Sequence, residues 1–104
     1  MEIMNKLIRT KLREKILETD PNATFIDLTS IEVESELKKK LLEEVQEFIE
    51  AKSVYEKNEE MADILEVIDA FYSFDLLKKE HVLHAKTKKY EERGGFNEGI
   101  YWKQ

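Results

Sequence analysis

Residues that interrupt helices are scarce in this chain. Its 104 residues include only three glycines and one proline, whereas Glu, Lys and Leu are abundant. Straight side chains such as these lose little rotamer freedom in an α-helix, while glycine and proline disfavour helix interiors. The composition therefore predicts an all-α fold, a four-helix bundle of the up-and-down type. At this length we expect one domain spanning residues 1–104.

Apolar residues at helical spacing, together with capping signals, divide the chain into four expected helices. These helices cover about residues 4–19, 30–52, 53–72 and 75–92. Thr29 followed by Glu32, and Ser53 followed by Glu56, have the spacing of capping boxes, which open helices. The tight turn at Ser53 predicts that the second and third helices are antiparallel neighbours.

The charge balance and hydropathy pattern exclude several functional classes. Seventeen Lys and Arg against 23 Asp and Glu give a net charge of −6, which argues against binding to a nucleic acid polymer. No apolar run approaches the about 18–20 residues of a membrane span, and the opening MEIMNKLIRT lacks the apolar stretch of a signal peptide. We therefore expect a cytoplasmic protein with no membrane partner.

A chain of this size forms only a small core. A domain of about 100 residues buries roughly 60–65% of its unfolded surface, so association between copies would add stability. The apolar stripe expected on the second helix contains Leu37, Leu41, Leu42, Val45, Phe48 and Ile49.

Two acidic pairs, each with a spacing of three residues, lie in the second and third expected helices. They are Glu44 with Glu47 and Glu60 with Asp63. At about 100° per residue, Glu44 lies at the edge of the apolar stripe and Glu47 just beyond it. Glu60 and Asp63 point with the apolar residues of their own helix. Burying ionised carboxylates is costly unless they are paired or coordinate a metal, so this acidic quartet is a candidate metal site.

The ligand chemistry limits which metal such a site would hold. The chain has no cysteine, which leaves carboxylate oxygens as the abundant ligands. Oxygen ligands suit Mg²⁺, with Mn²⁺ as an alternative, and Mg²⁺ is typically held by a few carboxylates together with waters and substrate phosphates. The alternative is that the quartet belongs to solvated helix faces with lysine partners. Glu43 and Glu66 flank the quartet, but their helical angles point away from the stripe.

Basic residues gather on the first and fourth expected helices. They are Lys6, Arg9 and Lys11 on the first, and Lys86, Lys89 and Arg93 on the fourth. Such groups suit the neutralisation of a polyphosphate. The alternative is an ordinary solvated surface, which is where most lysines lie.

Four sequence blocks, taken in order, resemble one known superfamily. The blocks are NKLIRTK, KKLLEEVQEF, EEMADILEVIDA and ERGGF, and 12 residues separate Glu44-x-x-Glu47 from Glu60-x-x-Asp63. This pattern is similar to the all-α NTP pyrophosphatase superfamily, the MazG-like proteins related to phosphoribosyl-ATP pyrophosphohydrolase. The opening block departs from the family at Thr10 and Arg13, where aspartate and proline are common, which leaves the role of the first helix open.

The resemblance implies Mg²⁺-dependent hydrolysis of a nucleoside triphosphate between the α- and β-phosphates, giving a monophosphate and pyrophosphate. It also implies a homodimer or homotetramer. Carried over to this chain, the metal ligands are Glu44, Glu47, Glu60 and Asp63, with Glu47 or Glu44 orienting the attacking water. The residues that would bind phosphate are Lys89 and Arg93, with Lys86, Lys6 and Arg9 as further candidates.

Two other functions are compatible with the same sequence. One is a catalytically silent nucleotide-binding or regulatory module that uses the same pocket. The other is a helical interaction protein whose acidic groups are neutralised by lysines across a subunit interface. For an enzyme, standard dNTPs, modified nucleotides and a phosphoribosylated nucleotide all stay open as substrates, and a role in maintaining the nucleotide pool is one possibility.

Overall fold

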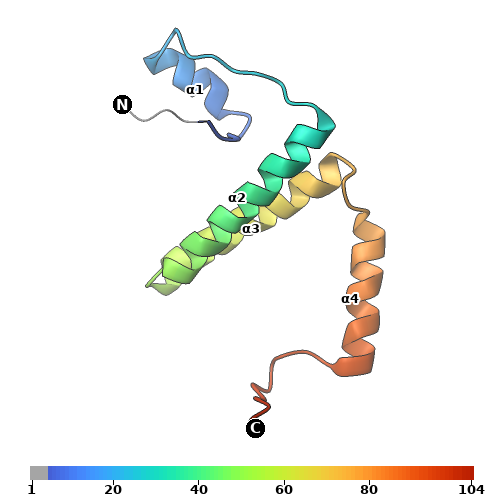
Figure 1. The fold of residues 1–104 in the computed structure, drawn as a ribbon. Helices are drawn as coiled ribbons and strands as arrows, with labels where there is room; N and C mark the ends of the chain where they lie inside the picture. The colour runs from blue at the N-terminus through green and yellow to red at the C-terminus, as the bar shows by residue number, and fades with distance from the viewer. Residues whose placement is uncertain (1–4) are drawn as a thin grey trace.

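Four α-helices and no strand make up the structure over residues 5–104, the part of the chain that the computed structural model describes (Figure 1). The helices are α1 (Leu12–Thr19), α2 (Ser30–Glu50), α3 (Val54–Ser73) and α4 (Lys79–Arg93). The predicted all-α class with four helices is confirmed. None of the described helices is both long enough and apolar enough to cross a membrane.

The capping box predicted at Thr29 is complete, whereas at Ser53 only the hydroxyl cap is formed, because the Glu56 carboxylate accepts from the Lys52 N–H instead. The Thr29 hydroxyl accepts a hydrogen bond from the Glu32 backbone N–H at 3.3 Å, and the Glu32 carboxylate accepts one from the Thr29 N–H at 2.9 Å. The bond that the Glu32 carboxylate accepts from the Thr29 backbone N–H is the largest cause that lowers the pKa of Glu32. At the start of α3, the Ser53 hydroxyl accepts from the Glu56 N–H at 3.0 Å. Each cap satisfies backbone groups that a helix leaves unpaired at its N-terminus.

The core lies between α2 and α3, which run side by side as an antiparallel hairpin (Figure 1). Its buried residues are Val33, Leu37, Val67 and Phe71. Partly buried apolar residues packed against them are Leu7, Leu28, Leu41, Ala70 and Leu76. The predicted pairing of the second and third helices is therefore correct, and this hairpin holds the core of the described residues.

The helix α1 is shorter than the sequence pattern predicts. It begins at Leu12, whereas the expected helix began near Met4, which itself lies outside the described residues. Residues 5–11, hereafter the N-terminal segment, are not helical. Leu7 packs against the core of the hairpin, so a tertiary contact overrides the local helix preference here.

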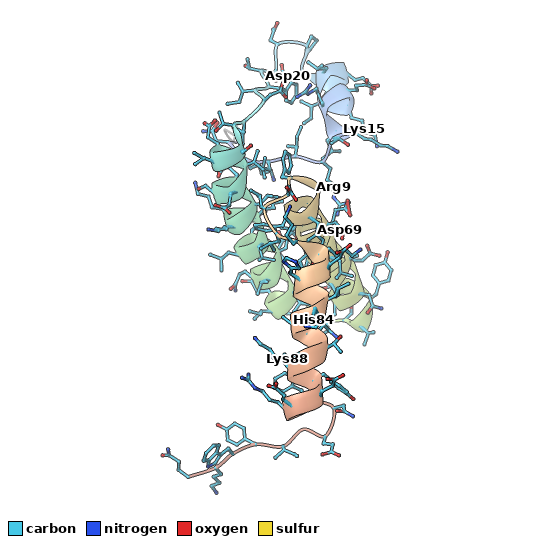
Figure 2. The ribbon with its side chains drawn as sticks, turned by 90° about the vertical axis from the view of Figure 1, so that its right-hand side faces the viewer. Arg9, Lys15, Asp20, Asp69, His84 and Lys88 are labelled. Atoms are coloured by element: carbon cyan, nitrogen blue, oxygen red, sulfur yellow. The ribbon has the colours of Figure 1, made fainter. Side chains whose placement is uncertain are left out.

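The helix α4 begins four residues later than predicted, at Lys79. Asp75 adopts a left-handed conformation with φ of 59°, and the N–H of Leu76 returns to the carbonyl of Phe71 at 3.0 Å, so the chain cannot continue α3 as a helix. Every residue of α4 is exposed, including His84 and Lys88, which lie along its length in Figure 2. The helix runs away from the hairpin (Figure 1).

A single chain covers only part of its own apolar surface. Its radius of gyration is 17.8 Å, compared with about 13 Å for a compact chain of this length. It exposes 9821 Å², compared with about 6,100 Å² for a compact protein of the same mass. Leu42 and Ile49 of the predicted apolar stripe are 72% and 65% exposed. The stripe is therefore wider than the face that α3 covers.

Candidate metal centre

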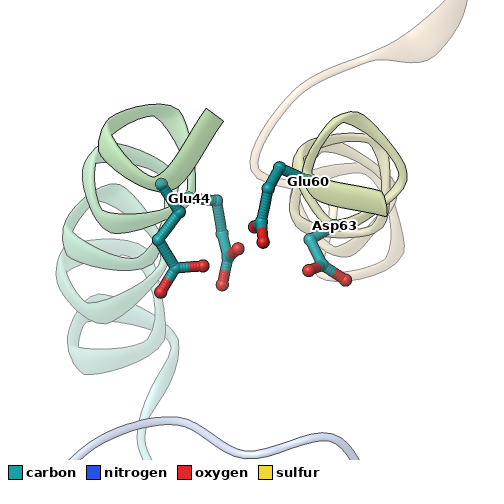
Figure 3. A group of neighbouring side chains, drawn as sticks. Glu44, Glu60 and Asp63 are labelled. Carbon is teal, nitrogen blue, oxygen red and sulfur yellow. The ribbon is translucent and has the colours of Figure 1, made fainter. Parts of the chain in front are cut away.

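The hairpin brings the acidic quartet together at one place between its helices (Figure 3). Glu44 and Glu47 lie one turn apart on α2, and Glu60 and Asp63 lie one turn apart on α3. Because the two helices are antiparallel, Glu47 and Glu60 form the pair nearer the connecting turn. One carboxylate oxygen from each residue lies within 4.8 Å of the oxygens from all the others.

This spacing fits the coordination of a small divalent cation. Mg²⁺ holds oxygen ligands at about 2.0–2.1 Å, so two oxygens on opposite sides of one ion lie about 4.2 Å apart. The largest separation in the quartet, at most 4.8 Å, needs only small side-chain movements to meet that limit. The four residues could therefore hold a metal ion.

Burial in the quartet is uneven. Glu44 is only 6% exposed, Glu60 and Asp63 are half-buried, and Glu47 is exposed. One oxygen of Glu44 and one of Glu60 are buried without a hydrogen-bond partner. A buried, unpaired carboxylate oxygen costs free energy that a bound cation would recover, which is a second observation in favour of a metal.

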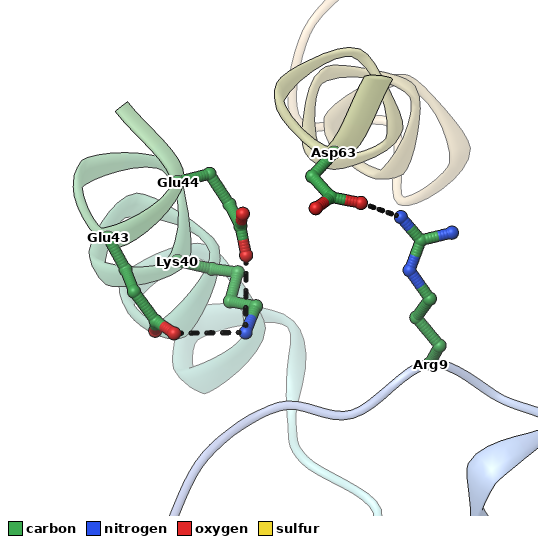
Figure 4. A network of polar contacts seen from close by, with 5 residues as sticks. All are labelled: Arg9, Lys40, Glu43, Glu44 and Asp63. Atoms are coloured by element: carbon green, nitrogen blue, oxygen red, sulfur yellow. Dashed lines mark hydrogen bonds and ion pairs between the residues drawn. The ribbon is translucent and has the colours of Figure 1, made fainter. Parts of the chain in front are cut away.

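Two basic residues form ion pairs with the quartet, as Figure 4 shows. The Lys40 ammonium lies 3.5 Å from the carboxylates of both Glu43 and Glu44. The guanidinium of Arg9 lies 2.6 Å from Asp63. Within residues 5–104, two positive charges thus face four carboxyl groups.

Loss of solvent contact, together with neighbouring carboxyl groups, raises the pKa of the two α2 members of the quartet. Burial is the largest cause raising the pKa of Glu44, followed by a hydrogen bond to Glu47 and the charges of Glu47 and Asp63, while Lys40 partly opposes the shift. Burial also raises the pKa of Glu47, with a hydrogen bond to Glu60 as the next cause. A cation in the site would favour the charged forms of both groups.

The other candidate residues fall into separate places. Glu43 is exposed and pairs with Lys40, and Glu66 is exposed. Lys6 and Arg9 belong to the non-helical N-terminal segment, and of these two Arg9 contacts the quartet.

The basic residues of the fourth helix stand apart from the quartet within one chain. Lys86, Lys89 and Arg93 all lie on exposed α4, which runs away from the hairpin (Figure 1). Lys86 and Lys89 line a shallow groove there together with Tyr90 and Phe96.

The sequence patterns above did not predict two contacts of the site. Lys40 precedes Glu44 by four residues, a spacing that places both on one helix face, so this pair could have been found. Arg9 and Asp63 are 54 residues apart, and no local pattern predicts that they meet.

Comparisons of the chain with models of known protein families, with curated proteins and with solved structures found no match.

Proposed function

We propose that this chain is a Mg²⁺-dependent nucleoside triphosphate pyrophosphohydrolase, which hydrolyses an NTP or dNTP between the α- and β-phosphates to a monophosphate and pyrophosphate. The observation that carries the proposal is the convergence of four carboxylates from α2 and α3, two of which hold buried oxygens without partners. The ordered sequence blocks around these residues support it.

The four carboxylates differ in burial, and the difference suggests separate roles. Glu44 is buried and Glu60 and Asp63 are half-buried, which suits metal ligands. A bound Mg²⁺, or Mn²⁺ in its place, would neutralise charge on the phosphate oxygens and position them for attack by water.

Glu47 is the exposed member of the quartet and is the better candidate to orient the attacking water. Its carboxylate converges with the other three yet stays open to solvent, so it can accept a proton from a water at the site. Glu44 is too deeply buried to meet a bulk water directly and serves better as a ligand.

A second copy of the chain is needed to complete the phosphate-binding surface. The hairpin helices carry 13 acidic residues against four lysines, whereas α4 carries five basic residues against three acidic ones. In a homodimer or homotetramer, α4 of one copy would lie on the hairpin of another. Lys86, Lys89 and Arg93 would then face the triphosphate held at the quartet.

The test is a pyrophosphate-release assay with Mg²⁺ or Mn²⁺ against a panel of standard and modified NTPs and dNTPs. Asp63→Asn and Glu60→Gln should each abolish release because each removes a ligand charge. Asp69→Asn, at an exposed position six residues along the same helix, should retain it. Full activity of Asp63→Asn would overturn the proposal, and nucleotide binding without turnover would instead indicate a silent regulatory module.

A further inference from the structure

The contact between Arg9 and Asp63 joins the non-helical N-terminal segment to the helical hairpin. Asp63 lies in the middle of α3, within the packed hairpin. Arg9 lies in the non-helical N-terminal segment, which is tied to the hairpin core through Leu7. Figure 4 shows the guanidinium reaching Asp63 from outside the hairpin. Lys40, in contrast, belongs to the same helix as its partner Glu44.

Arg9 contacts a carboxylate that is also a candidate metal ligand. Its guanidinium lies 2.6 Å from Oδ1 of Asp63, a candidate metal ligand. A divalent cation at the quartet and a guanidinium on the same carboxylate would repel each other at this range. This repulsion makes each cation weaken the binding of the other to Asp63.

The Arg9 contact is suited to being broken. The side chains of Arg9 and Asp63 are 58% and 39% exposed, so solvent screens the pair and makes its net contribution small. The N-terminal segment has no regular secondary structure that would have to unfold when Arg9 moves away. The released guanidinium would then lie beside the site, where a triphosphate offers oxygens for a paired hydrogen bond.

We propose that Arg9 is the resident counter-ion of the candidate metal site: it competes with the divalent cation for Asp63, leaves as the cation binds, and then binds the triphosphate. This inference rests on the proposed function. As a consequence, Arg9 should lower the affinity of the site for metal alone. Once metal is bound, Arg9 should raise the affinity for the nucleotide. The N-terminal segment thereby couples occupancy of the metal site to the arrival of substrate.

The first experiment measures Mn²⁺ affinity without nucleotide, from the electron paramagnetic resonance signal of free Mn²⁺. Arg9→Gln should bind Mn²⁺ about two- to fivefold more tightly than the unaltered chain, the range expected for an exposed ion pair. Arg9→Lys keeps the charge and should stay close to the unaltered chain.

Arg13→Gln is the matched control because it removes the same charge from a nearby position. Arg13 pairs with Asp27 at 3.3 Å and lies over the ring of Phe25, so it does not contact the quartet. The Arg13→Gln variant should therefore leave the Mn²⁺ affinity unchanged. Equal tightening in Arg13→Gln and Arg9→Gln would reflect net charge alone and would overturn the inference.

The second measurement tests the opposite effect of Arg9, its contribution to nucleotide binding once the metal is present. With saturating Mn²⁺ and a triphosphate whose α,β-bridging oxygen is replaced by methylene, Arg9→Gln should bind nucleotide several-fold more weakly. In the unaltered chain, hydrogen exchange at residues 5–11 should speed up when Mn²⁺ is added alone and slow down again when the analogue follows. Exchange that Mn²⁺ leaves unchanged or slows would contradict the displacement of Arg9.

The outcomes separate this inference from the proposed function. If the unaltered chain binds Mn²⁺ and Arg9→Gln binds it equally well, Arg9 is no competitor, while the enzyme proposal stands. If the unaltered chain binds no Mn²⁺ with or without nucleotide, both proposals fail.

Discussion

At the scale of single residues, Glu44 is notable as a buried carboxyl group. It is only 6% exposed, and one of its oxygens has no hydrogen-bond partner. Lys40 compensates only part of its charge, since the same ammonium also contacts Glu43. A carboxylate held in this way destabilises the metal-free fold and gains by binding a cation.

Replacing this charge should separate stability from metal binding. Glu44→Gln keeps the shape but removes the charge, so the metal-free protein should gain about 1 kcal/mol in its free energy of unfolding. Mn²⁺ binding should be lost. Urea unfolding and Mn²⁺ titration measure the two effects, with the exposed Glu43→Gln as a control that should retain metal binding. A large loss of stability in Glu44→Gln would contradict the argument.

The raised pKa values of Glu44 and Glu47 predict an unusual pH dependence. Their folded-state pKa values lie above those of the unfolded chain, so the folded protein binds more protons between the two values. This contribution to stability is fully present below the ordinary glutamate pKa and is lost as the pH rises through the raised values. Across that interval, Mn²⁺ affinity should fall as the pH falls, since the protonated carboxyls cannot serve as ligands.

The double variant Glu44→Gln/Glu47→Gln is the control for this pH effect. Metal-free thermal unfolding across a pH series should show a flatter profile for the double variant than for the unaltered chain. Identical profiles would mean that other groups control the pH dependence.

At the scale of secondary-structure elements, the α2–α3 hairpin determines the site geometry. The caps at Thr29 and Ser53 fix where each helix begins, and core packing by Leu37 and Phe71 holds the two helices in register. The quartet lies away from both caps, in the interior of the two helices. Its geometry therefore depends on packing of the helices more than on their ends.

Removing either cap should cost stability but leave the site intact. Thr29→Ala and Ser53→Ala should each lower the free energy of unfolding by about 1 kcal/mol because a backbone N–H loses its acceptor. Metal affinity of the folded variants should stay within a factor of two of the unaltered chain, an expectation from independent distant sites. Leu37→Ala, a core change, should cost more, about 3 kcal/mol. A cap variant that lost metal binding while remaining folded would show that the helix ends determine the site.

At the scale of the whole molecule, a single chain leaves much of its apolar surface exposed to solvent. The chain exposes about 3,700 Å² more than a compact protein of its mass, and a stable interface typically buries about 1,200–2,000 Å² in total. Leu42 and Ile49 lie on the uncovered side of α2, seven residues apart and therefore on one helix face. Association of copies would cover them.

Sedimentation equilibrium should accordingly show a dimer or tetramer. Leu42→Glu should shift the population toward monomer by placing a charge in the interface, and pyrophosphate release should fall with it. Asn22→Glu adds the same charge in an exposed loop and should leave assembly unchanged. Circular dichroism would establish that Leu42→Glu is still helical. A monomeric unaltered chain with full activity would rule out the shared site.

Local signals were sufficient for much of this structure. The scarcity of helix breakers predicted the fold class, and the hydroxyl caps at Thr29 and Ser53 located the starts of α2 and α3 to within a residue. The angle of each carboxylate on its helix predicted that the quartet would converge across an antiparallel pair. These features follow from the period of the helix, because that period places residues three or four positions apart on the same face.

Long-range packing determined the remaining features. Leu7 and Arg9 contact the hairpin, which keeps the N-terminal segment out of the helix that its apolar spacing predicted. The left-handed turn at Asp75 sends α4 away from the hairpin and leaves its basic residues apart from the quartet within one chain. The sequence by itself thus determined α2 and α3 and the faces that these two helices present. Only the tertiary structure decided which faces meet, because the spacing of residues within one helix does not reveal its contacts with segments far away in the sequence.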